Sequence, residues 1–274
     1  MQQHFFLPLL TYPDNTSEFM IANGVALARH MKASLTACTV EIAIPHVSPA
    51  LGSLIVDTVK LTQEAEALSR QRGSFLARKT LEEAKAASVE IRMRNMTAGE
   101  PFVADMLAEA ARAYDLVLLE AAGLYRPVVE AVLFESGRPL VLYPRQSFGG
   151  RIDHVAIAWD GSTAAASAVH NAAPFIEHAS KVHLVCVTDE KIVNDEAGDH
   201  LIENFRRSGV AAEMVRVHAA DRPIGDVLQT QAFELRADLL VMGGFGHSRL
   251  REFVLGGATK SVLTNVLLPV LLSH

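Results

Sequence analysis

The sequence predicts an α/β protein made of two tandem, doubly wound and mostly parallel five-stranded sheets that pack as a pseudo-dimer. Three observations predict it. Apolar, β-rich runs alternate with helical patterns along all 274 residues, which is the order of a parallel sheet with helices on both faces. Many of these runs are continuously apolar, as in strands that are buried on both faces. The second half of the chain then repeats the pattern of the first, which indicates a duplicated domain.

The individual elements follow from these runs. In the first half, strands are expected at residues 4–10, 34–42, 89–96, 115–119 and 139–143. In the second half, they are expected at 153–159, 181–188, 210–217, 238–242 and 269–272. Helices are expected at 17–31, 102–113, 163–177, 224–235 and 259–266. A longer helical insertion at 56–88, where the second half has only 189–208, is interpreted as an amphipathic cover of the sheet.

The two halves match at paired positions. A strand that begins at Asp115 in the first half is repeated by one that begins at Asp238, each after a helix that follows a proline. We therefore expect a first domain at residues 1–147 and a second at 151–274, separated within the turn residues 146–150. Because the two domains share a fold, we expect them to pair within the chain as the subunits of a dimer would, and a further homodimer stays open.

Composition narrows the classes of function. Half of the residues are hydrophobic and the formal net charge is −6, whereas a nucleic-acid partner calls for a basic face. No apolar run approaches the roughly 20 residues of a membrane helix, and the first residues lack the features of a signal peptide. The two cysteines, Cys38 and Cys186, lie in apolar runs and are interpreted as core residues. We expect a cytoplasmic protein without a membrane or nucleic-acid partner.

A glycine-rich segment distinguishes the second half. Gly243, Gly246 and Gly256 follow the strand expected at 238–242 and precede the helix expected at 259–266. Glycines let backbone N–H groups approach a ligand closely, and a helix N-terminus adds free donors that suit phosphate. The segment lacks the Gly-Lys-Ser/Thr of a P-loop, and the first turn of this half is no dinucleotide fingerprint. A phosphate-bearing ligand is therefore expected at the carboxyl ends of the strands.

The spacing of these glycines, Gly-x2-Gly-x9-Gly, resembles the nucleotide loop of the universal stress protein family. The turn Asp160-Gly161-Ser162 and the closing strand after Pro269 are similar to that family as well. The resemblance covers the second half and reaches the first only through the repeat. It implies the UspA-type, adenine nucleotide α-hydrolase-like fold and ATP as the ligand, with ADP or AMP as alternatives and Mg²⁺ as a companion of the nucleotide. It also implies that the last strands pair, which places Tyr143 and Leu271 near the interface of the two domains.

The resemblance further implies which residues bind the nucleotide. Asp160 would contact the adenine or ribose, Val187 would line the adenine pocket, and the glycines with His247 would border the phosphates. Gly257 stands where the family has Ser or Thr, and Thr259 is the nearest hydroxyl that could replace it. The complete set of expected binding residues is Ala158, Trp159, Asp160, Val187, Met242, Gly243, Gly246, His247, Gly256, Gly257, Ala258 and Thr259.

The first half lacks the loop. Its counterpart reads Glu120-Ala121-Ala122-Gly123, without the paired glycines, and its first turn lacks Asp-Gly-Ser. Glu120 would place a carboxylate where phosphates should lie, and like charges disfavour one another. We therefore expect one nucleotide site in each chain, with the first domain as a structural partner.

Three functions stay open at this point. The first is an ATP-binding regulatory protein of the stress response that hydrolyses ATP slowly or not at all. The second is a Mg²⁺-dependent ATPase, for which Asp160 and His247 are the available acid–base residues. The third is an interaction module without nucleotide, which captures a protein partner on the long helical insertion of the first half. No residue is assigned a catalytic role. The scattered histidines, with His170 and His178 expected on one helix, predict no metal site.

Overall fold

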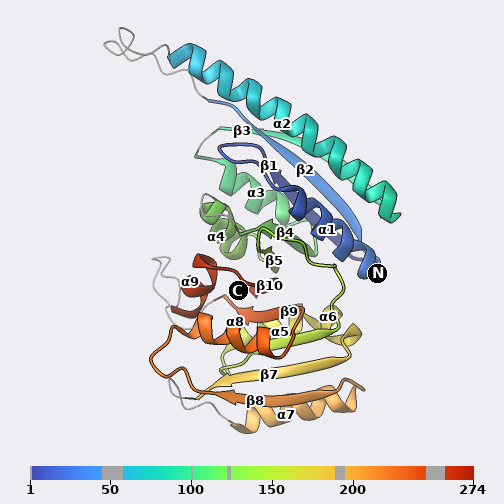
Figure 1. Cartoon of the computed structure of the whole chain (residues 1–274), viewed down its shortest axis with the longest axis vertical. Coiled ribbons are helices and arrows are strands. Elements are labelled where there is room, and N and C mark those ends of the chain that lie inside the picture. The colour runs from blue at the N-terminus through green and yellow to red at the C-terminus, as the bar shows by residue number, and fades with distance from the viewer. Residues whose placement is uncertain (1, 45–57, 100, 122–124, 189–194, 245–256) are drawn as a thin grey trace.

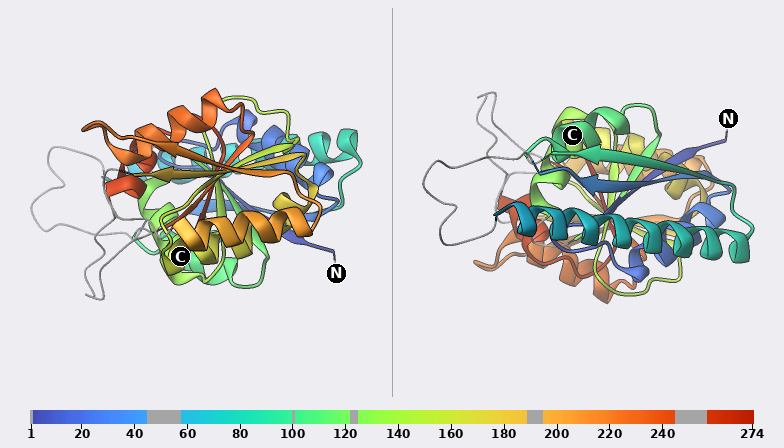
Figure 2. Two further views of the ribbon diagram at one scale, coloured as in Figure 1. Left: turned by 90° about the horizontal axis from the view of Figure 1, so that it is seen from below. Right: turned by 90° about the horizontal axis from the view of Figure 1, so that it is seen from above.

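The chain forms one continuous ten-stranded sheet with helices on both of its faces (Figures 1 and 2). The structure is a computed structural model that describes residues 2–44, 58–99, 101–121, 125–188, 195–244 and 257–274. The strands are β1 (His4–Leu10), β2 (Ser34–Ile42), β3 (Ile91–Ala98), β4 (Leu116–Glu120), β5 (Leu140–Tyr143), β6 (His154–Ala158), β7 (Lys181–Val187), β8 (Ala212–Val217), β9 (Leu239–Gly243) and β10 (Val270–Ser273).

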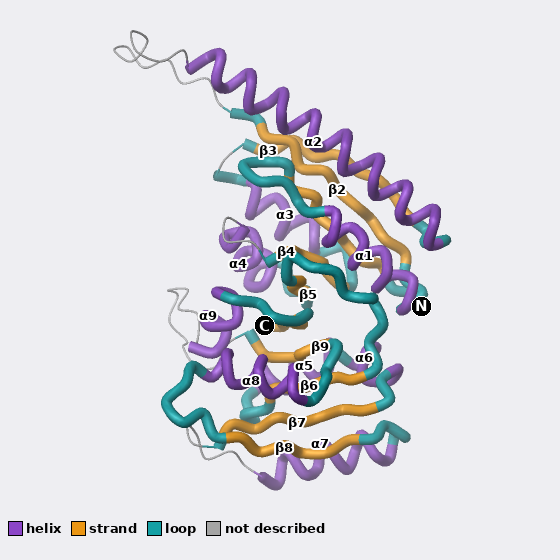
Figure 3. The backbone as a smooth tube through the Cα atoms, viewed as in Figure 1, coloured by secondary structure: helices purple, strands orange, loops and turns teal. Residues whose placement is uncertain are grey.

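The helices lie between these strands in the order expected for a doubly wound fold, as the backbone trace of Figure 3 shows. They are α1 (Glu18–His30), α2 (Thr58–Ala87), α3 (Val103–Ala111), α4 (Arg126–Glu135), α5 (Thr163–Asn171), α6 (Ala173–His178), α7 (Asp195–Arg207), α8 (Ile224–Glu234) and α9 (Gly257–Thr264). One buried apolar cluster joins α1, α2, α5, α6 and α7 to one face of the sheet. A second joins α3, α4, α8 and α9 to the other.

The sheet order is β3-β2-β1-β4-β5-β10-β9-β6-β7-β8. Neighbouring strands are parallel within each half, and β5 and β10 pair in the antiparallel sense, with Leu142 opposite Val270 and Val141 opposite Leu271. The fifth strand of each half therefore meets its counterpart, as the resemblance implied. The two expected five-stranded sheets are the two halves of a single ten-stranded sheet, because this edge-to-edge pairing satisfies the backbone groups that each half alone would leave exposed.

The strands lie where the sequence predicted them, within two residues at each end. The helices differ in two places. The helix expected at 163–177 is two helices, α5 and α6, because Pro174 stands in the first turn of α6 and cannot donate the hydrogen bond that would continue α5. Helix α4 is an element that the sequence analysis did not predict. Within the part of the chain that is described, no helix is long and apolar enough to cross a membrane.

The segment between the halves is fixed against α1. The buried side chain of Asn23 donates from Nδ2 to the carbonyl of Gln146 at 2.8 Å, and its Oδ1 accepts from the backbone N–H of Phe148 at 2.8 Å. Gly150 has a φ of +68°, and a Cβ atom there would lie 2.4 Å from the Cβ of Ala26. Only glycine satisfies both that backbone and that close approach. The two halves are thus joined by a docked segment.

Candidate functional site

The carboxyl ends of β6, β7 and β9 lie side by side in the second half. β6 is the central strand of the three, with Ala158 opposite Val185 of β7 and Ile157 opposite Val241 of β9. The side chains and turns that follow these strands therefore meet at one edge of the sheet, where ligands bind in open α/β folds. This edge contains the described members of the binding set expected from the sequence.

The turn after β6 is built around Asp160. Gly161 has a φ of +73°, which glycine adopts without strain. Oδ1 of Asp160 accepts from the backbone N–H of Ser162 at 3.0 Å, and Oγ of Ser162 accepts from the backbone N–H of Ala165 at 3.1 Å. Asp160 and Ser162 together satisfy donors at the start of α5, as capping residues do. The carboxylate of Asp160 is therefore held at the carboxyl end of β6.

Gly243 ends β9 directly beneath α5. A Cβ atom at this position would lie 2.6 Å from the backbone carbon of Ala164 and 2.8 Å from its Cβ. These distances are far inside van der Waals contact, so any side chain would displace α5. Gly243 is therefore required by the packing of β9 against α5.

The first turn of α9 is the open part of this edge. Gly257 is exposed, and a Cβ atom there would meet nothing within 4 Å. Lys260 is exposed in the same turn. Thr259, expected to replace a missing hydroxyl, is only 2% exposed and packs inward. Ala258, between Gly257 and Thr259, is half-buried.

Helix α8 holds α9 in place. Asp226 accepts a 2.5 Å hydrogen bond from the hydroxyl of Ser261. The buried amide of Gln229 donates to the carbonyl of Asn265 at 2.8 Å and accepts from the N–H of Leu267 at 2.8 Å. The N-terminus of α9 is thereby positioned independently of any ligand.

The other described residues of the expected binding set lie on the two opposite faces of the sheet. Ala158 and Val187 are half-buried and pack against the cluster beneath α8 and α9, which also contains Met242. Trp159 belongs to the opposite cluster, where its indole lies near Gly198 of α7. The structure therefore does not bring the Trp159 side chain together with Ala158 and Val187. Gly246, His247 and Gly256 lie outside the described residues.

The first half closes the corresponding edge with its own carboxylate. Glu120 ends β4, is only 4% exposed, and accepts hydrogen bonds from the backbone N–H of Ser17 at 3.2 Å and from the Ser17 hydroxyl. Nε of Arg145 lies 3.6 Å from Oε2 of Glu120. Ser17 also caps α1 by accepting from the N–H of Met20. Glu120 thus takes the donors at the start of α1 that an anionic ligand would otherwise use.

Side chains from other elements complete this closure. Arg72 of α2 donates to the carbonyls of Thr11 at 3.1 Å and of Pro13 at 2.7 Å. The hydroxyl of Tyr125 donates to the carbonyl of Asp14. Burial, with Glu120 nearby, raises the pKa of Tyr125 well above its ordinary value, so it remains a donor. The turn that follows β1 is therefore held by hydrogen bonds from Arg72 and from Tyr125. The expected role of the long helix as a cover of the sheet is confirmed by its fully buried residues Leu76 and Ala84.

The histidines and cysteines do not form a metal site within the described ranges. His170 and His178 lie on different helices, α5 and α6, so the expectation that one helix carries both is wrong. Cys38 and Cys186 are buried and not joined in a disulfide, as expected of core residues. The sequence analysis missed the partners of Glu120, although Ser17 has the pattern of an N-cap three residues before Met20.

Comparisons with known proteins relate this chain to one family. The model of the universal stress protein family matches residues 151–274. The universal stress protein Slr1230 of Synechocystis sp. is 25% identical over 240 residues, which cover 80% of this chain and 77% of that protein.

Solved structures agree over the whole length. A universal stress protein from Archaeoglobus fulgidus covers 98% of this chain and of its own, with a TM-score of 0.67 and 15% identity. A protein of unknown function from Pseudomonas aeruginosa covers 98% of this chain and 92% of its own, with a TM-score of 0.55 and 11% identity. These likenesses extend the shared fold to the first half. Residues 151–274 therefore match the universal stress protein family, and the whole chain, with its two similar halves in tandem, has the fold of the Archaeoglobus protein.

Proposed function

We propose that the chain is an ATP-binding regulatory protein of the stress response, with one nucleotide site in a second domain, residues 151–274. A first domain, residues 1–147, has closed its own site. One observation carries this proposal. In the second half, the N–H of Ser162 is satisfied by Asp160 from its own turn, whereas in the first half the N–H of Ser17 is satisfied by Glu120 from the end of β4. The carboxylate that fills the first edge thus has no counterpart at Gly243.

The described residues support distinct parts of an adenine-nucleotide site. Ala158 and Val187 offer a half-buried apolar surface to the base. Asp160 is positioned to accept from a ribose hydroxyl. The exposed start of α9, at Gly257, presents backbone N–H groups of the kind that bind phosphate. Lys260 adds a cation in the same turn.

The residues that the family resemblance adds would border the phosphates. Gly246, His247 and Gly256 belong to this part of the proposed site, and Mg²⁺ would accompany the nucleotide there. We propose that hydrolysis is slow or absent, because Asp160 already accepts a hydrogen bond from Ser162 and is constrained by its turn. A general base needs freedom to reach the attacking water.

Mass spectrometry of ligand released from the purified chain, together with ATP titration, tests this function. Wild type should bind about one ATP per chain, since one nucleotide site is proposed. Gly257→Glu places a carboxylate at the open start of α9 and should weaken ATP binding at least tenfold, about 1.4 kcal/mol. Ser208→Glu makes the same charge change at an exposed position beyond α7 and should bind as wild type does.

Three results would contradict the proposal. Two equivalents of ATP per chain would mean that the first half also binds nucleotide. Absence of binding by wild type at millimolar ATP would leave an interaction module as the function of the family fold in this chain. Release of γ-phosphate at several turnovers per minute in Mg²⁺ would instead identify an ATPase, and parallel titrations with ADP and AMP identify the preferred nucleotide.

A further inference from the structure

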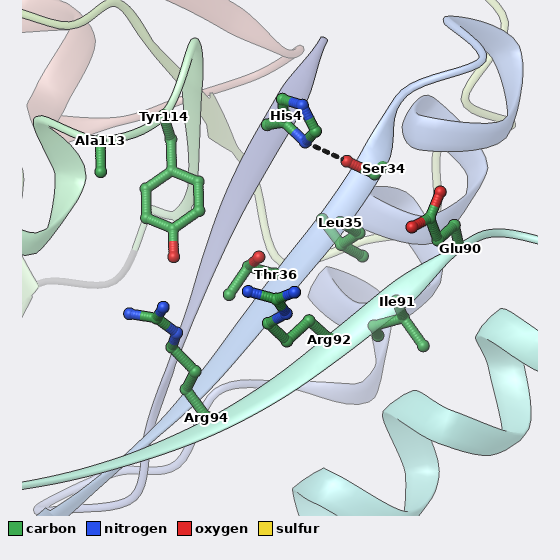
Figure 4. A pocket seen from close by; sticks show the side chains of 10 residues that line it. All are labelled: His4, Ser34, Leu35, Thr36, Glu90, Ile91, Arg92, Arg94, Ala113 and Tyr114. Atoms are coloured by element: carbon green, nitrogen blue, oxygen red, sulfur yellow. Dashed lines mark hydrogen bonds between the residues drawn. The ribbon is translucent and has the colours of Figure 1, made fainter. Parts of the chain in front are cut away.

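A cleft of about 500 Å³ opens on the first half at the amino ends of β1 and β2 and along β3, the edge strand of the sheet (Figure 4). This end of the sheet is opposite to the carboxyl ends that hold the nucleotide site. The volume lies within the range of small-molecule pockets. The residues that line it are His4, Ser34, Leu35, Thr36, Glu90, Ile91, Arg92, Arg94, Ala113 and Tyr114.

Two arginines give the cleft its charge. Arg92 and Arg94 are two residues apart on β3, so both side chains lie on the same face of the strand. Both are exposed, and neither forms an ion pair with any of the described residues. Figure 4 shows their guanidinium groups turned toward the same space as the hydroxyls of Thr36 and Tyr114.

The wall opposite the arginines is rigid. The ring of Tyr114 stacks on the buried ring of Phe6, with centroids 4.7 Å apart and planes 10° from parallel. Asp115, the next residue, accepts from the backbone N–H of His4 at 2.8 Å. Tyr114 is therefore held in place, and its hydroxyl faces the arginines. Preorganised donors of this kind lower the cost of ordering when a ligand binds.

The second half provides an internal comparison. Its Asp238 accepts from the N–H of His154, as Asp115 does from His4, so the two halves can be aligned strand by strand. Arg92 of β3 lies opposite Thr36, the third residue of β2. In the second half, the corresponding third residue of β7 is His183, and Glu213 of β8 lies opposite it.

Glu213 is fully engaged there. Its Oε1 lies 2.9 Å from Nζ of Lys181 and 3.1 Å from Nε2 of His183. Ala237 takes the place of Tyr114. The second half thus neutralises its own charges at this surface, whereas the first half leaves two cations and two hydroxyls facing a cleft. Fold alone does not demand the arginines.

We propose that this cleft binds the phosphate group of a small phosphorylated molecule, with Arg92 and Arg94 as the charged ligands and the hydroxyls of Thr36 and Tyr114 as additional donors. Guanidinium groups match phosphate oxygens in bidentate geometry, and charge-assisted bonds are the strong ones. Donors from two strands and one turn surround a group with three free oxygens better than a planar carboxylate with two.

The end of the cleft away from the arginines can bind the part of the ligand that carries no phosphate. Glu90 lines that end, and the hydroxyl of Ser34 is hydrogen-bonded to Nδ1 of His4. A carboxylate and a hydroxyl at this position favour hydroxyl or amine groups of a ligand over a second anion. A sugar phosphate or similar phosphomonoester has this distribution of charge.

Isothermal titration with glycerol 3-phosphate tests the site, with malonate as the dicarboxylate probe and glycerol as the neutral one. Wild type should bind glycerol 3-phosphate saturably at one per chain, more tightly than malonate, and glycerol should not bind. Arg92→Gln and Arg94→Gln should each weaken binding about tenfold or more, because each loses a charge-assisted hydrogen bond. Arg216→Gln, on the edge strand β8 at the other end of the sheet, makes the same charge change and should bind as wild type does.

Other outcomes overturn the proposal. The first is that wild type fails to saturate with glycerol 3-phosphate below about 10 mM, a concentration that already allows weak specific binding. The second is that malonate binds as tightly as glycerol 3-phosphate. The third is that Arg216→Gln weakens binding as much as the two cleft variants do. Circular dichroism establishes that each variant is folded, which is expected because both arginines are exposed. The Gly257→Glu variant should retain glycerol 3-phosphate binding, so failure of the nucleotide site and failure of this cleft are distinguishable.

Discussion

Glu120 and Gly243 occupy the same position in the two halves of the sheet, each as the last residue of the strand beside the first strand of its half. Glu120 reaches Ser17 at the start of α1, whereas Gly243 allows Ala164 of α5 to approach closely. The residue at this position thereby determines whether the N-terminus of the neighbouring helix is hydrogen-bonded by a carboxylate from the end of the strand. The difference between a closed and an open edge rests on this pair.

Removing the Glu120 carboxylate should destabilise the chain. In Glu120→Ala, the N–H and hydroxyl of Ser17 lose a buried acceptor, and such losses cost about 2 kcal/mol or more. Arg145, which is half exposed, should contribute little of this. Urea-induced unfolding measures the change in free energy. The matched control is Glu130→Ala, which breaks an exposed pair with Arg126 and should cost less than about 0.5 kcal/mol. Equal losses in both variants would contradict the capping role of Glu120.

Two glycines at the proposed nucleotide edge should respond oppositely to alanine. Gly243→Ala forces a methyl group into the backbone of Ala164 and should destabilise by about 1–3 kcal/mol, as overpacking does. Gly257→Ala meets open space at the start of α9 and should leave the free energy of unfolding unchanged or slightly raised. Urea unfolding of both variants checks this. A neutral Gly243→Ala would show that α5 can move away from β9.

Much of the fold could be predicted from the sequence because burial on both faces leaves continuous apolar runs. The ends of β1 and β2 were predicted to the residue for this reason. The break at Pro174 was missed because a proline is tolerated in a first helical turn, and the apolar pattern continues across it. Helix α4 was missed because its segment was analysed only as a lost glycine loop.

The candidate site was predictable where local pattern decides it. The turn at Asp160 follows from residue type and spacing, whereas the close approach of Ala164 to Gly243 joins distant parts of the chain and was not predicted. The contact between Glu120 and Ser17 joins residues far apart in the chain, so no local pattern indicates it. Tertiary packing also determines on which face of the sheet the side chain of Trp159 lies. The sequence analysis did not single out Arg92 and Arg94, because only the structure places them beside a cleft.

The stability of the second half should depend on pH through His183. Burial, followed by the nearby charge of Lys181, lowers the pKa of His183 below its ordinary value of 6.5. The unfolded chain therefore binds a proton more readily, and stability falls as the pH drops through 6.5 toward the lower folded pKa. Urea unfolding of wild type and His183→Gln at several pH values measures this. The variant should lose less stability over that range, by at most about 1.4 kcal/mol per pH unit for one proton.

An exposed histidine provides the control for this pH dependence. His178 ends α6, is exposed, and lies 2.7 Å from the carbonyl of Pro174 through its Nδ1. His178→Gln should show the same pH profile of unfolding free energy as wild type. If His183→Gln also keeps the wild-type profile, the stability of the fold does not depend on a neutral, buried His183.

The segment that joins the halves should loosen when Asn23 is replaced. Asn23→Ala removes both hydrogen bonds to the backbone of Gln146 and Phe148 and leaves the half-buried N–H of Phe148 without this acceptor, which should cost about 1–2 kcal/mol. Limited proteolysis should then cut within residues 146–150 faster than in wild type. Gln146→Ala is the matched control, because it changes an exposed side chain of the same segment and keeps the carbonyl that Asn23 binds. Cleavage at the wild-type rate in Asn23→Ala would mean that the packing of Phe148 and the close approach of Gly150 suffice to dock the segment.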